Sequence, residues 1–513
     1  MDLAYLIRRA ARAYPQAPAA GDRETTISLA EVVRRAERFA NALDRLGVGE
    51  GAAVGVLSEN RIEYVVVDAA LALARRVRVA LNCRLHRDDF RFALRDSGAQ
   101  VLVHSAAFAE DAAALASDLG FIAIDLDSDG GSAMSFAGIV ADESGASVVR
   151  AGVDEDPAWI SYTSGTSGRP KGVVLSHRAL REVAFNLLLE LGPRQRGERI
   201  VLAQPLSHGA GYLVLPHLLA GGGVYIMDGF VADEAVWAAG QPGVNTLKVV
   251  PAMFPPLLEA CAATGGSIGY DCVIYGAAPM PAPILEESLE RFGPVLVQIY
   301  GQSEAPMTIT CLHKEDHKRP GPHRATAGRA WQSVAVEARN PDGETLPAGE
   351  IGEIVIQGPH HMTGYLGLPA ETAEVLRDGW VWTKDVGTID DQGFVQLLGR
   401  SDEMINSGGF NISPREVEQA LQDHPAVVDC VVLGVPDARW GTAVNALVEL
   451  RAESPADAEE IVDFLRPRLS FRTPKRIVVT DGIPRNPYGK VDRARARLAL
   501  GVGSIEEIDG SSD

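Results

Sequence analysis

The most informative part of this chain is the stretch Ser161-Tyr162-Thr163-Ser164-Gly165-Thr166-Ser167-Gly168-Arg169-Pro170-Lys171-Gly172-Val173-Val174-Leu175-Ser176-His177. Its glycines let backbone N–H groups turn toward one point, its hydroxyls add donors, and such a concavity binds phosphate oxygens. Lys171 adds a positive charge, and the apolar run that follows tethers the loop to a packed element. Pro170 before the lysine excludes the nucleotide loop G-x-x-x-x-G-K-[ST]. The alternative is a Ser/Gly linker, but linkers rarely place Pro-Lys-Gly before a buried run.

The composition indicates a large globular protein. The 513 residues suffice for more than one domain, and a hydrophobic fraction of 46% supports large cores. The net charge of −20, from 48 basic and 68 acidic side chains, argues against a nucleic acid or an anionic membrane as partner. Because the global field repels anions, an anionic ligand must be met by local donors.

The cysteines and the N-terminal stretch suggest a cytoplasmic protein. No C-x-x-C spacing occurs, and we expect reduced thiols at Cys83, Cys261, Cys272, Cys311 and Cys430. The N-terminal stretch lacks the continuous apolar core and the small-residue cleavage site of a secretion signal. No run approaches 18 uninterrupted apolar residues, so we expect no membrane span.

Helical and strand patterns alternate through about residue 250. The apolar spacing over 28–48 predicts a helix that Ser28 can cap. The same reasoning predicts further helices at 62–74 and 88–96 and strands at 54–57, 77–81 and 101–104. This alternation predicts an α/β fold with parallel sheets covered by helices.

Two smaller units are expected after the α/β part. Short strands at 334–338, 352–356 and 393–398 predict an antiparallel β unit. Beyond a break at Gly399 to Asp402, Ser413 and Pro414 open a capped helix over 413–422. Strands at 427–434 and 444–450 and a helix at 455–469 are expected to follow. The predicted domains are 1–399 (two αβ-layered subdomains plus the β unit, about 334–399), a hinge at 400–402, a small α+β domain at 403–497 and a disordered acidic tail at 498–513.

Four further segments carry candidate chemistry. Gly276-Ala277-Ala278-Pro279-Met280 follows an apolar run, and its small residues let a flat ring lie against the backbone; the alternative is simply a tight strand-to-helix turn. Tyr300-Gly301-Gln302-Ser303-Glu304 places an aromatic ring, a hydroxyl and a carboxylate just beyond a strand. The other two are Trp380-Val381-Trp382-Thr383-Lys384-Asp385-Val386-Gly387 and the glycine pair Gly408-Gly409 with the residues around it.

Taken in order over residues 20–497, these segments resemble the signatures of the adenylate-forming superfamily, which holds acyl-CoA synthetases, nonribosomal peptide adenylation domains and beetle luciferases. The chain is most similar to a carboxylic acid–CoA ligase. Ser167 and Ser303 replace threonines of the usual patterns and keep the hydroxyl. Lys384 replaces the glycine of a Thr-Gly-Asp run, and Phe410 stands where Glu or Tyr is common. Pro484 to Lys490 resembles the Pro-x-x-x-x-Gly-Lys run of the family, although a lysine on such a tip would otherwise be read as a solvated surface residue.

The resemblance implies an ATP site and a mobile domain. Tyr300 is expected to stack on adenine, Ser303 to bond phosphate and Glu304 to bind Mg²⁺. Asp385 is expected to accept the ribose hydroxyls and Lys490 to bridge the carboxylate and the α-phosphate. Asp402 corresponds to the hinge, and Gly408, Gly409 and Phe410 to the wall of a CoA tunnel. The remaining expected ATP or AMP contacts are Thr163 (also expected in catalysis), Ser164, Gly165, Thr166, Ser167, Gly168, Lys171, Gly276, Ala277, Ala278, Pro279, Gly301, Gln302 and Arg400.

The stretch Ala203 to Tyr212 is expected to enter the acyl site, with His208 beside the substrate carboxylate, although a structural role for this histidine is equally open. The Asp that holds the ammonium of amino-acid substrates in related adenylation domains is missing. The small or apolar residues Gly209, Ala210, Gly211, Gly276, Ala277 and Met307 predict a roomy apolar pocket for an aryl, alicyclic or fatty acid.

The resemblance therefore implies an ATP- and Mg²⁺-dependent acyl-CoA synthetase that forms an acyl-AMP, releases pyrophosphate and passes the acyl group to coenzyme A. The second hypothesis is an acyl-AMP ligase that loads a carrier protein. Free CoA is favoured over a carrier protein as acceptor because the sequence shows no carrier domain. A regulatory adenylate-binding protein without activity is the third hypothesis, disfavoured by Lys490 and Glu304. A homodimer is plausible by resemblance.

Overall fold

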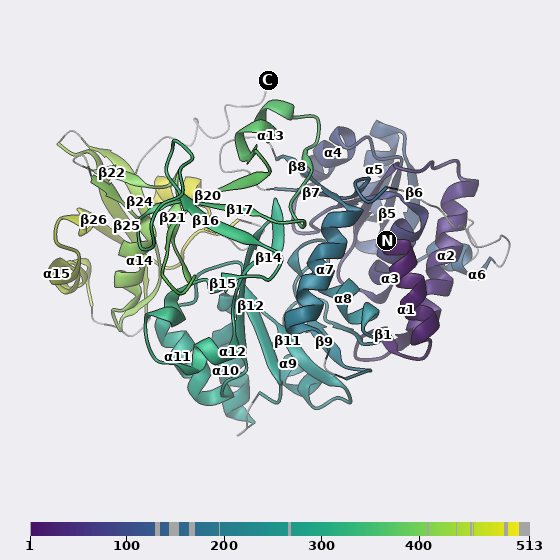
Figure 1. The fold of residues 1–513 in the computed structure, drawn as a ribbon, viewed down its shortest axis with the longest axis horizontal. Coiled ribbons are helices and arrows are strands. Elements are labelled where there is room, and N and C mark those ends of the chain that lie inside the picture. The colour runs from purple at the N-terminus through teal and green to yellow at the C-terminus, as the bar shows by residue number, and fades with distance from the viewer. Residues whose placement is uncertain are drawn as a thin grey trace.

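The computed structural model describes residues 2–128, 134–142, 153–163, 170–193, 195–264, 268–407, 410–437, 439–451, 454, 456–486 and 491–501. Within this part the chain forms two large sheets, three smaller sheets and the helices around them. Figure 1 shows the purple-to-teal N-terminal half on one side and the yellow-green C-terminal elements at the opposite end. The fold is mixed α/β, as the alternating periodicity predicts.

The larger sheet is parallel in its middle and antiparallel at its edges. Strands β1, β9, β10, β11, β12 and β13 run parallel, whereas β2, β14 and β15 run antiparallel to their neighbours. The carboxyl ends of the parallel strands therefore meet at one edge, which is where ligands bind in such sheets. The strand order is β15 (Arg329–Ala330), β14 (Ala305–Leu312), β13 (Leu296–Gln302), β12 (Cys272–Gly276), β11 (Val244–Lys248), β9 (Arg199–Leu202), β10 (Gly223–Ile226), β1 (Pro18–Gly21) and β2 (Thr26–Ser28).

The second sheet has the same character. Strands β3 to β7 are parallel, and β8 and β18 close one edge in antiparallel pairings. Strand β18 comes from a much later part of the chain than β8, so this edge joins distant segments. The order is β18 (Gly364–Tyr365), β8 (Gly172–Ser176), β7 (Pro157–Tyr162), β4 (Val77–Ala80), β3 (Ala53–Leu57), β5 (Val101–His104) and β6 (Ile122–Asp125).

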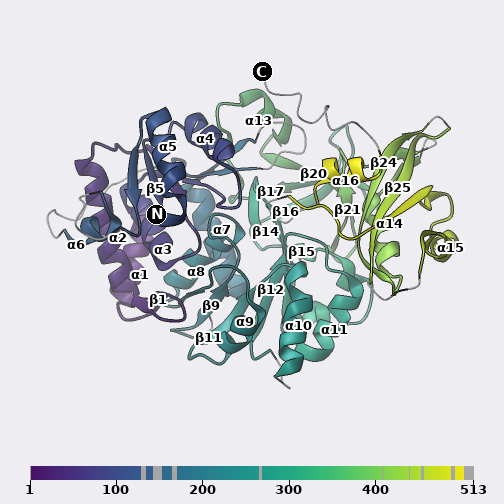
Figure 2. The same cartoon turned by 180° about the vertical axis from the view of Figure 1, so that it is seen from behind.

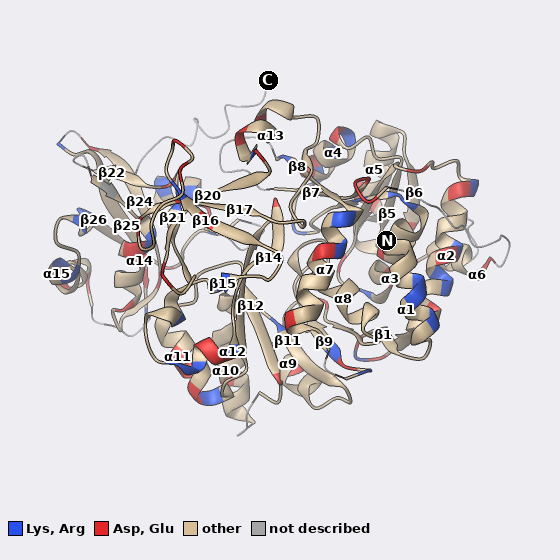
Figure 3. Ribbon diagram, viewed as in Figure 1, with Lys and Arg blue, Asp and Glu red and all other residues tan. Residues whose placement is uncertain are grey.

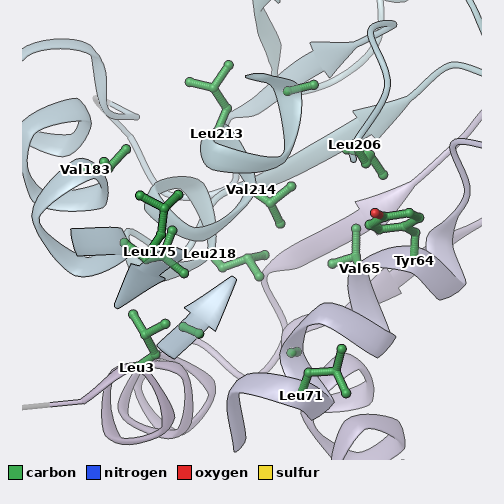
Figure 4. Close-up of a cluster of buried hydrophobic side chains, with 14 of the residues drawn as sticks. Leu3, Tyr64, Val65, Leu71, Leu175, Val183, Leu206, Leu213, Val214 and Leu218 are labelled. Atoms are coloured by element: carbon green, nitrogen blue, oxygen red, sulfur yellow. The ribbon is translucent and has the colours of Figure 1, made fainter. Parts of the chain in front are cut away.

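The main hydrophobic core lies between the two large sheets. It is filled by helices that present apolar side chains to both, including Val65 and Leu71 of α3 and Leu218 of α8, as Figure 4 shows. The helices of this layer are α1 (Leu3–Ala13), α2 (Leu29–Arg45), α3 (Ile62–Ala74), α7 (His177–Leu191) and α8 (Val214–Leu219), with the 3-10 helix η2 (Gly209–Leu213). Burial of this apolar area is the dominant stabilising contribution to the two-sheet arrangement.

Two outer layers cover the remaining faces of the sheets. Helices α9 (Ala232–Ala239), α10 (Phe254–Ala263) and α11 (Ala282–Phe292) pack on the far side of the larger sheet. Helices α4 (Arg87–Asp96) and α5 (Ala109–Leu119) pack on the far side of the second sheet. The sheets are therefore buried on both faces, which explains their nearly continuous apolar strands.

The smaller sheets follow in the order that the sequence predicts. The β unit contains β16 (Ala335–Arg339), β17 (Gly352–Gln357), β19 (Leu376–Arg377), β20 (Trp380–Ile389) and β21 (Val395–Arg400), with helix α13 (Pro369–Val375) beside it. The C-terminal unit has its own apolar clusters. It contains β22 (Ile405–Ser407), β23 (Phe410–Ile412), β24 (Val427–Asp437), β25 (Gly441–Leu450), β26 (Arg476–Thr480), α14 (Pro414–Gln422), α15 (Ala458–Leu469), η5 (Ser470–Arg472) and α16 (Arg493–Ala499), seen at the right of Figure 2.

Helix caps explain where the expected helices begin. Ser28 Oγ accepts from Glu31 N at 3.2 Å, so the helix predicted at 28–48 begins at Leu29, and it ends at Arg45. Ser413 caps α14 as predicted. The helix expected from residue 455 begins instead at Ala458, because the carboxylate of Asp457 accepts the first free N–H groups. The strand expected from residue 393 begins at Val395, because Gly393 adopts a left-handed φ of 82° in the preceding turn.

Charged side chains are prominent on several helices. In Figure 3 blue and red gather on α1, α2, α7 and α11, while β12 is tan. In the part of the chain that is described, no helix combines the length and the apolar character needed to cross a bilayer. The expected acidic tail beyond Gly501 lies outside the described residues.

One ion pair lies inside the core. Arg78 of β4 is 1% exposed, and its Nη1 donates to Asp68 Oδ2 of α3 at 2.6 Å. The guanidinium stacks 3.4 Å from the ring centroid of Trp159 on β7. Burial raises the pKa of Asp68 to about 6, although Arg78 opposes this shift. The pair therefore depends on both partners being present.

We expect Asp68→Ala to lower the free energy of unfolding by about 3 to 5 kcal/mol, because it leaves Arg78 buried without a counter-charge. The double variant Asp68→Leu/Arg78→Met replaces the pair with apolar groups of similar volume and should unfold close to the wild type. Urea unfolding of the three proteins measures this. A single variant that loses less than about 1 kcal/mol would show that the pair is dispensable.

Candidate active site

The described residues on either side of the glycine-rich segment belong to paired strands of the second sheet. Strands β7 and β8 pair antiparallel, and Thr163 N donates to the carbonyl of Lys171 at 3.1 Å. The sequence places the predicted phosphate-binding residues Ser164 to Gly168 between these two residues, and they lie outside the described part. The paired strands therefore fix both ends of the segment on which the phosphate-binding prediction rests.

Glu304, the expected magnesium ligand, is joined to these paired strands by a tyrosine that the sequence reasoning did not single out. Tyr365 of β18 pairs with β8, and its hydroxyl donates to Glu304 Oε1 at 2.7 Å. Lys171 Nζ lies 5.1 Å from the centroid of the same ring, in a cation–π contact. Burial, and then the carboxylate of Glu304, raise the pKa of Tyr365. The neutral phenol thus fixes the carboxylate next to the lysine.

The expected nucleotide residues Tyr300, Asp385 and Arg400 also come together. The hydroxyl of Tyr300, on β13, donates to Asp385 Oδ2 on β20. Arg400 Nη1, at the end of β21, lies 3.6 Å from Asp385 Oδ1, and Arg400 Nε lies 3.4 Å from Asp402 Oδ1. Burial alone would lower the pKa of Arg400, but the nearby carboxylates of Asp385, Asp402 and Glu304 raise it. Residues from β13, β20 and β21 therefore form one charged cluster.

Lys384 occupies a backbone conformation that favours glycine. Its φ is +62°, which places it in the left-handed region. The neighbouring backbone is fixed, because Lys384 N donates to Glu353 Oε1 at 2.8 Å and Asp385 N donates to Thr383 Oγ1 at 3.0 Å. This backbone conformation explains why the family's Thr-Gly-Asp run has a glycine here. Lys384 adopts the same conformation at a cost in conformational energy.

The acyl-site residues expected from η2 and β14 face each other. A side chain at Gly209 would lie 3.6 Å from Met307 Sδ, so these two residues are neighbours across the gap. His208 precedes η2, and its Nδ1 lies 3.1 Å from Ser207 Oγ. Behind them Asn186 of α7 donates to Thr308 Oγ1 at 3.2 Å, which ties the helix to β14. The residues on which the pocket prediction rests therefore come together where η2 meets the carboxyl edge of the larger sheet.

Not every small residue in this region opens space. A Cβ at Gly211 would come within 2.2 Å of the Leu206 carbonyl oxygen, and one at Gly276 within 2.2 Å of the Ile299 carbonyl oxygen. A Cβ at Gly301 would lie 2.3 Å from Met307 N. Backbone atoms already fill these positions, so the three glycines permit close strand and loop packing. The room expected from Gly211 and Gly276 is not available at their Cβ positions.

Left-handed residues gather in the same region. Ala277, directly after β12, has a φ of 69°, and Met307 on β14 has a φ of 61°. With Lys384, these are three of the six described non-glycine residues with positive φ. Such strain persists where surrounding structure imposes it, typically at functional sites. Its clustering supports the carboxyl edge of the larger sheet as the active site.

The C-terminal unit contributes an arginine that the sequence reasoning did not assign. Arg415, the second residue of α14, is close enough to Glu418, Asp385 and Tyr300 for their charges to oppose the lowering of its pKa by burial. Phe410 of β23 is 59% exposed and pairs with Phe471 of η5 at 4.8 Å between centroids. Gly408, Gly409 and Lys490, expected in the CoA tunnel and in catalysis, lie outside the described residues.

Family models match most of the chain. The model described as AMP-binding enzyme matches residues 7–366, and the model described as AMP-binding enzyme C-terminal domain matches residues 416–490. This chain belongs to the AMP-binding enzyme family. The match covers both the two-sheet region and the C-terminal unit, and it confirms the superfamily that the motifs predict.

Curated relatives are similar over nearly their whole length. Feruloyl-CoA synthase from Amycolatopsis sp is 37% identical over 499 residues, covering 96% of this chain and 98% of the relative. Fatty acid–[acyl-carrier-protein] ligase ScoC from Streptomyces coeruleorubidus is 32% identical over 511 residues, covering 96% of each chain. The first relative is named for a CoA ester and the second for a carrier protein, so both acceptors occur among relatives.

Solved structures confirm the α/β architecture with a large and a small domain. The amide bond synthetase McbA from Marinactinospora thermotolerans has a TM-score of 0.88 at 27% identity and covers 97% of this chain and 99% of its own. ATP-bound MatB from Rhodopseudomonas palustris has a TM-score of 0.88, and apo MatB a TM-score of 0.78, each at 29% identity and covering 98% of this chain and 99% of its own. The arrangement here is therefore nearer to the ATP-bound form of MatB.

We expect Lys384→Gly to raise the free energy of unfolding by about 1 kcal/mol, because glycine adopts a φ of +62° without the steric penalty of a side chain. Lys384→Ala removes the charge but keeps the penalty, so it should unfold like the wild type. Urea unfolding midpoints compare the three proteins. If alanine stabilises as much as glycine, backbone strain at this position is not the reason.

We expect Tyr365→Phe to raise the Mg²⁺ concentration for half-maximal pyrophosphate release by about tenfold, because Glu304 loses the donor that orients it. The ring, and its contact with Lys171, remain. Tyr225→Phe removes a matched hydrogen bond, from Tyr225 to Glu234 at 3.0 Å on the far face of the sheet, and should leave the Mg²⁺ dependence unchanged. If both variants changed the Mg²⁺ dependence equally, Tyr365 would have no specific role in metal binding.

Proposed function

We propose that this chain is an acyl-CoA synthetase for aryl carboxylic acids. It catalyses ATP-dependent acyl-CoA synthesis through an acyl-AMP intermediate, with Mg²⁺ and coenzyme A. The observation that carries the proposal is the convergence of Lys171 and Glu304, through Tyr365, with the Asp385–Arg400 pair where the two large sheets and the β unit meet. An aryl acid, among the aryl, alicyclic and fatty acids expected from the sequence, is supported by the similarity to feruloyl-CoA synthase.

The first half-reaction needs alignment and charge compensation more than a side-chain nucleophile. An oxygen of the substrate carboxylate attacks the α-phosphorus of ATP, the bond to the β-phosphate oxygen breaks, and pyrophosphate leaves. In our proposal Lys171 and Arg400 offset the negative charge of the phosphates. Asp385 receives the ribose, and His208 lies beside the carboxylate. Lys490 enters to stabilise the charge that develops between the two anions.

The residues present fit a magnesium ion. One oxygen of Glu304 accepts the Tyr365 hydroxyl, and a single carboxylate with phosphate oxygens and water is the set that Mg²⁺ prefers. When bound, the ion neutralises phosphate charge. Among the described residues no cluster of three acidic, histidine or cysteine side chains could hold a metal by itself.

The second half-reaction transfers the acyl group. The sulfur of CoA attacks the acyl carbon of the adenylate, the bond to the phosphate oxygen breaks, and AMP leaves. We propose that the C-terminal domain rotates about Asp402, withdraws Lys490 and presents Gly408, Gly409 and Phe410 to the thiol. The ion pair between Arg400 Nε and Asp402 Oδ1, at 3.4 Å, would have to break or turn with such a motion.

Coenzyme A is the acceptor that we favour, and a carrier protein is the alternative, supported by the similarity to ScoC. We further propose that the enzyme acts in the cytoplasm and that it can form a homodimer. A regulatory protein without activity is disfavoured by the site carboxylates and cations.

The deciding experiment measures pyrophosphate release with ATP and Mg²⁺ across aryl, alicyclic and fatty acids, each with and without CoA. Continuous turnover that requires CoA, with an acyl-CoA product identified by mass, supports the proposal and names the acid. A single burst of pyrophosphate that CoA does not relieve points to a carrier protein. If no acid caused pyrophosphate release, the outcome would favour the hypothesis of a regulatory adenylate-binding protein without activity.

We expect Lys490→Ala to reduce acyl-adenylate formation by at least about 100-fold, because the charge that stabilises the transition state is removed. Thioester formation from a supplied acyl-adenylate and CoA should remain within about twofold of the wild type. Lys475→Ala removes another lysine of the C-terminal unit, whose Nζ donates to the Phe471 carbonyl, and serves as the control. Equal loss of both half-reactions in Lys490→Ala would contradict a role confined to the first.

A further inference from the structure

A lysine is buried inside the larger sheet. Lys248, the last residue of β11, is 3% exposed. Its Nζ donates to the carbonyl of Val249 at 2.8 Å, and within the described part of the chain it makes no further hydrogen bond and no ion pair. Lysine is almost never fully buried unless it is paired, and it usually extends its ammonium group to water. Two of its three donor positions are therefore unused inside the protein.

The strand register shows toward which layer Lys248 points. It lies beside Leu202 of β9 and Ile274 of β12 in parallel pairings, so all three side chains share one face. Leu202 and Ile274 belong to the core between the two sheets, whereas Leu247 and Val249 belong to the opposite face. Lys248 therefore faces the layer that contains η2, α7 and α8.

The same face carries the predicted acyl pocket. In β12, Gly276 follows Ile274 by two residues and thus shares its face, and β9 leads after Leu202 into the segment that ends at His208. Lys248 consequently lies on the strand between the two segments from which the acyl site is predicted. Met307, which faces Gly209, packs against the same core cluster.

The hydrogen bond of Lys248 holds its amine near the end of β12. Val249 N donates to the Ile274 carbonyl at 2.9 Å, so this edge of Val249 faces β12. In an extended strand the N–H and C=O of one residue face the same neighbour, so the Val249 carbonyl also faces β12. The amine is thereby drawn toward Gly276, at the carboxyl edge where ligands of parallel sheets bind.

Burial makes this lysine unlike a surface cation. It lowers the pKa of Lys248 to about 7, and no neighbouring charge opposes the shift. A methionine would fill a similar volume without this desolvation penalty. A donor with unused capacity in an otherwise apolar region is suited to select a ligand that brings its own acceptor.

We propose that Lys248 is a specificity-determining residue of the acyl site, and that the activated acid carries an oxygen acceptor at the end remote from its reacting carboxylate. This oxygen belongs to a hydroxyl, a methoxyl or a second carboxylate group, and Lys248 Nζ donates to it. The inference rests on the proposed acyl-CoA synthetase function and narrows its substrate. Lys248 then adds a polar group at the remote end of a pocket for which the sequence predicted small and apolar lining residues, with His208 beside the reacting carboxylate.

The test compares aryl acids of equal size that differ only in the para substituent of the ring. Benzoates and cinnamates that carry a hydroxyl, a carboxylate or a methyl group are assayed for kcat/KM of CoA-dependent pyrophosphate release. We expect the wild type to prefer an oxygen substituent over methyl by roughly 100-fold, because methyl leaves a buried donor unpaired. A preference for the hydroxyl acids would show that the group accepting from Lys248 is neutral. A preference for the carboxylate acids would show that it is anionic.

Lys248→Met should reduce this preference to about twofold or invert it, while kcat/KM for the methyl acids rises. Lys248→Gln keeps a donor and should retain part of the preference. Lys318→Met, on the exposed face of α12 (Lys314–Lys318), is the control and should behave as the wild type. A wild-type preference for methyl acids, or an oxygen preference that survives Lys248→Met, overturns the proposal.

Two further measurements separate this inference from the proposed function. Calorimetric binding of the same acid pairs, in the presence of a non-hydrolysable ATP analogue, tests Lys248 even if no acid is turned over. Equal affinity for hydroxyl, carboxylate and methyl acids in the wild type then overturns the role of Lys248 alone. Turnover with the expected selectivity but without any CoA requirement would contradict the CoA ligase and leave the role of Lys248 standing.

Discussion

The carboxylate of Asp385 joins parts of the chain that are far apart in sequence. One oxygen accepts the hydroxyl of Tyr300 from the larger sheet, and the other lies 3.6 Å from Arg400 at the end of the β unit. Arg415 of the C-terminal unit is within electrostatic range of the same group. The position of the β unit against the sheet edge, and the approach of the C-terminal unit, thus depend on one half-buried charge and its partners.

The charges of the site explain how an acidic protein can bind a polyanion. The described cations Lys171, Arg400 and Arg415 face the carboxylates of Glu304, Asp385 and Asp402, so the two signs nearly cancel. Such a site does not repel ATP as the net charge of −20 would, yet it offers little surplus positive charge for the transition state. A cation that enters only during adenylation, as proposed for Lys490, supplies that surplus without permanently opposing the carboxylates.

Local sequence patterns predicted what depends on local physics. Ser28 and Ser413 indicated where two helices begin, and the alternating periodicity predicted the elements of the α/β part. Glycine-rich segments at strand ends indicated the candidate site. Tyr365, Arg415 and Lys248 were not predicted as functional residues, because their significance arises only from strand pairing and domain packing. The edge pairing of β18 with β8 brings Tyr365 to Glu304, and no local pattern encodes a contact between such distant segments. The domain boundaries and the hinge stay predictions.

Gly211, Gly276 and Gly301 are closely packed against backbone atoms, so a substitution there would be harmful even if the residue never contacts the substrate. Every side chain larger than hydrogen would meet backbone atoms there, so a saturation library would be depleted at these positions whatever acid is supplied. Depletion of variants at these positions would then indicate a folding defect and would not identify substrate contacts. Attempts to enlarge or reshape the acyl pocket have to begin at side chains such as Met307, where the neighbouring Gly209 leaves space, because the backbone around these glycines cannot yield.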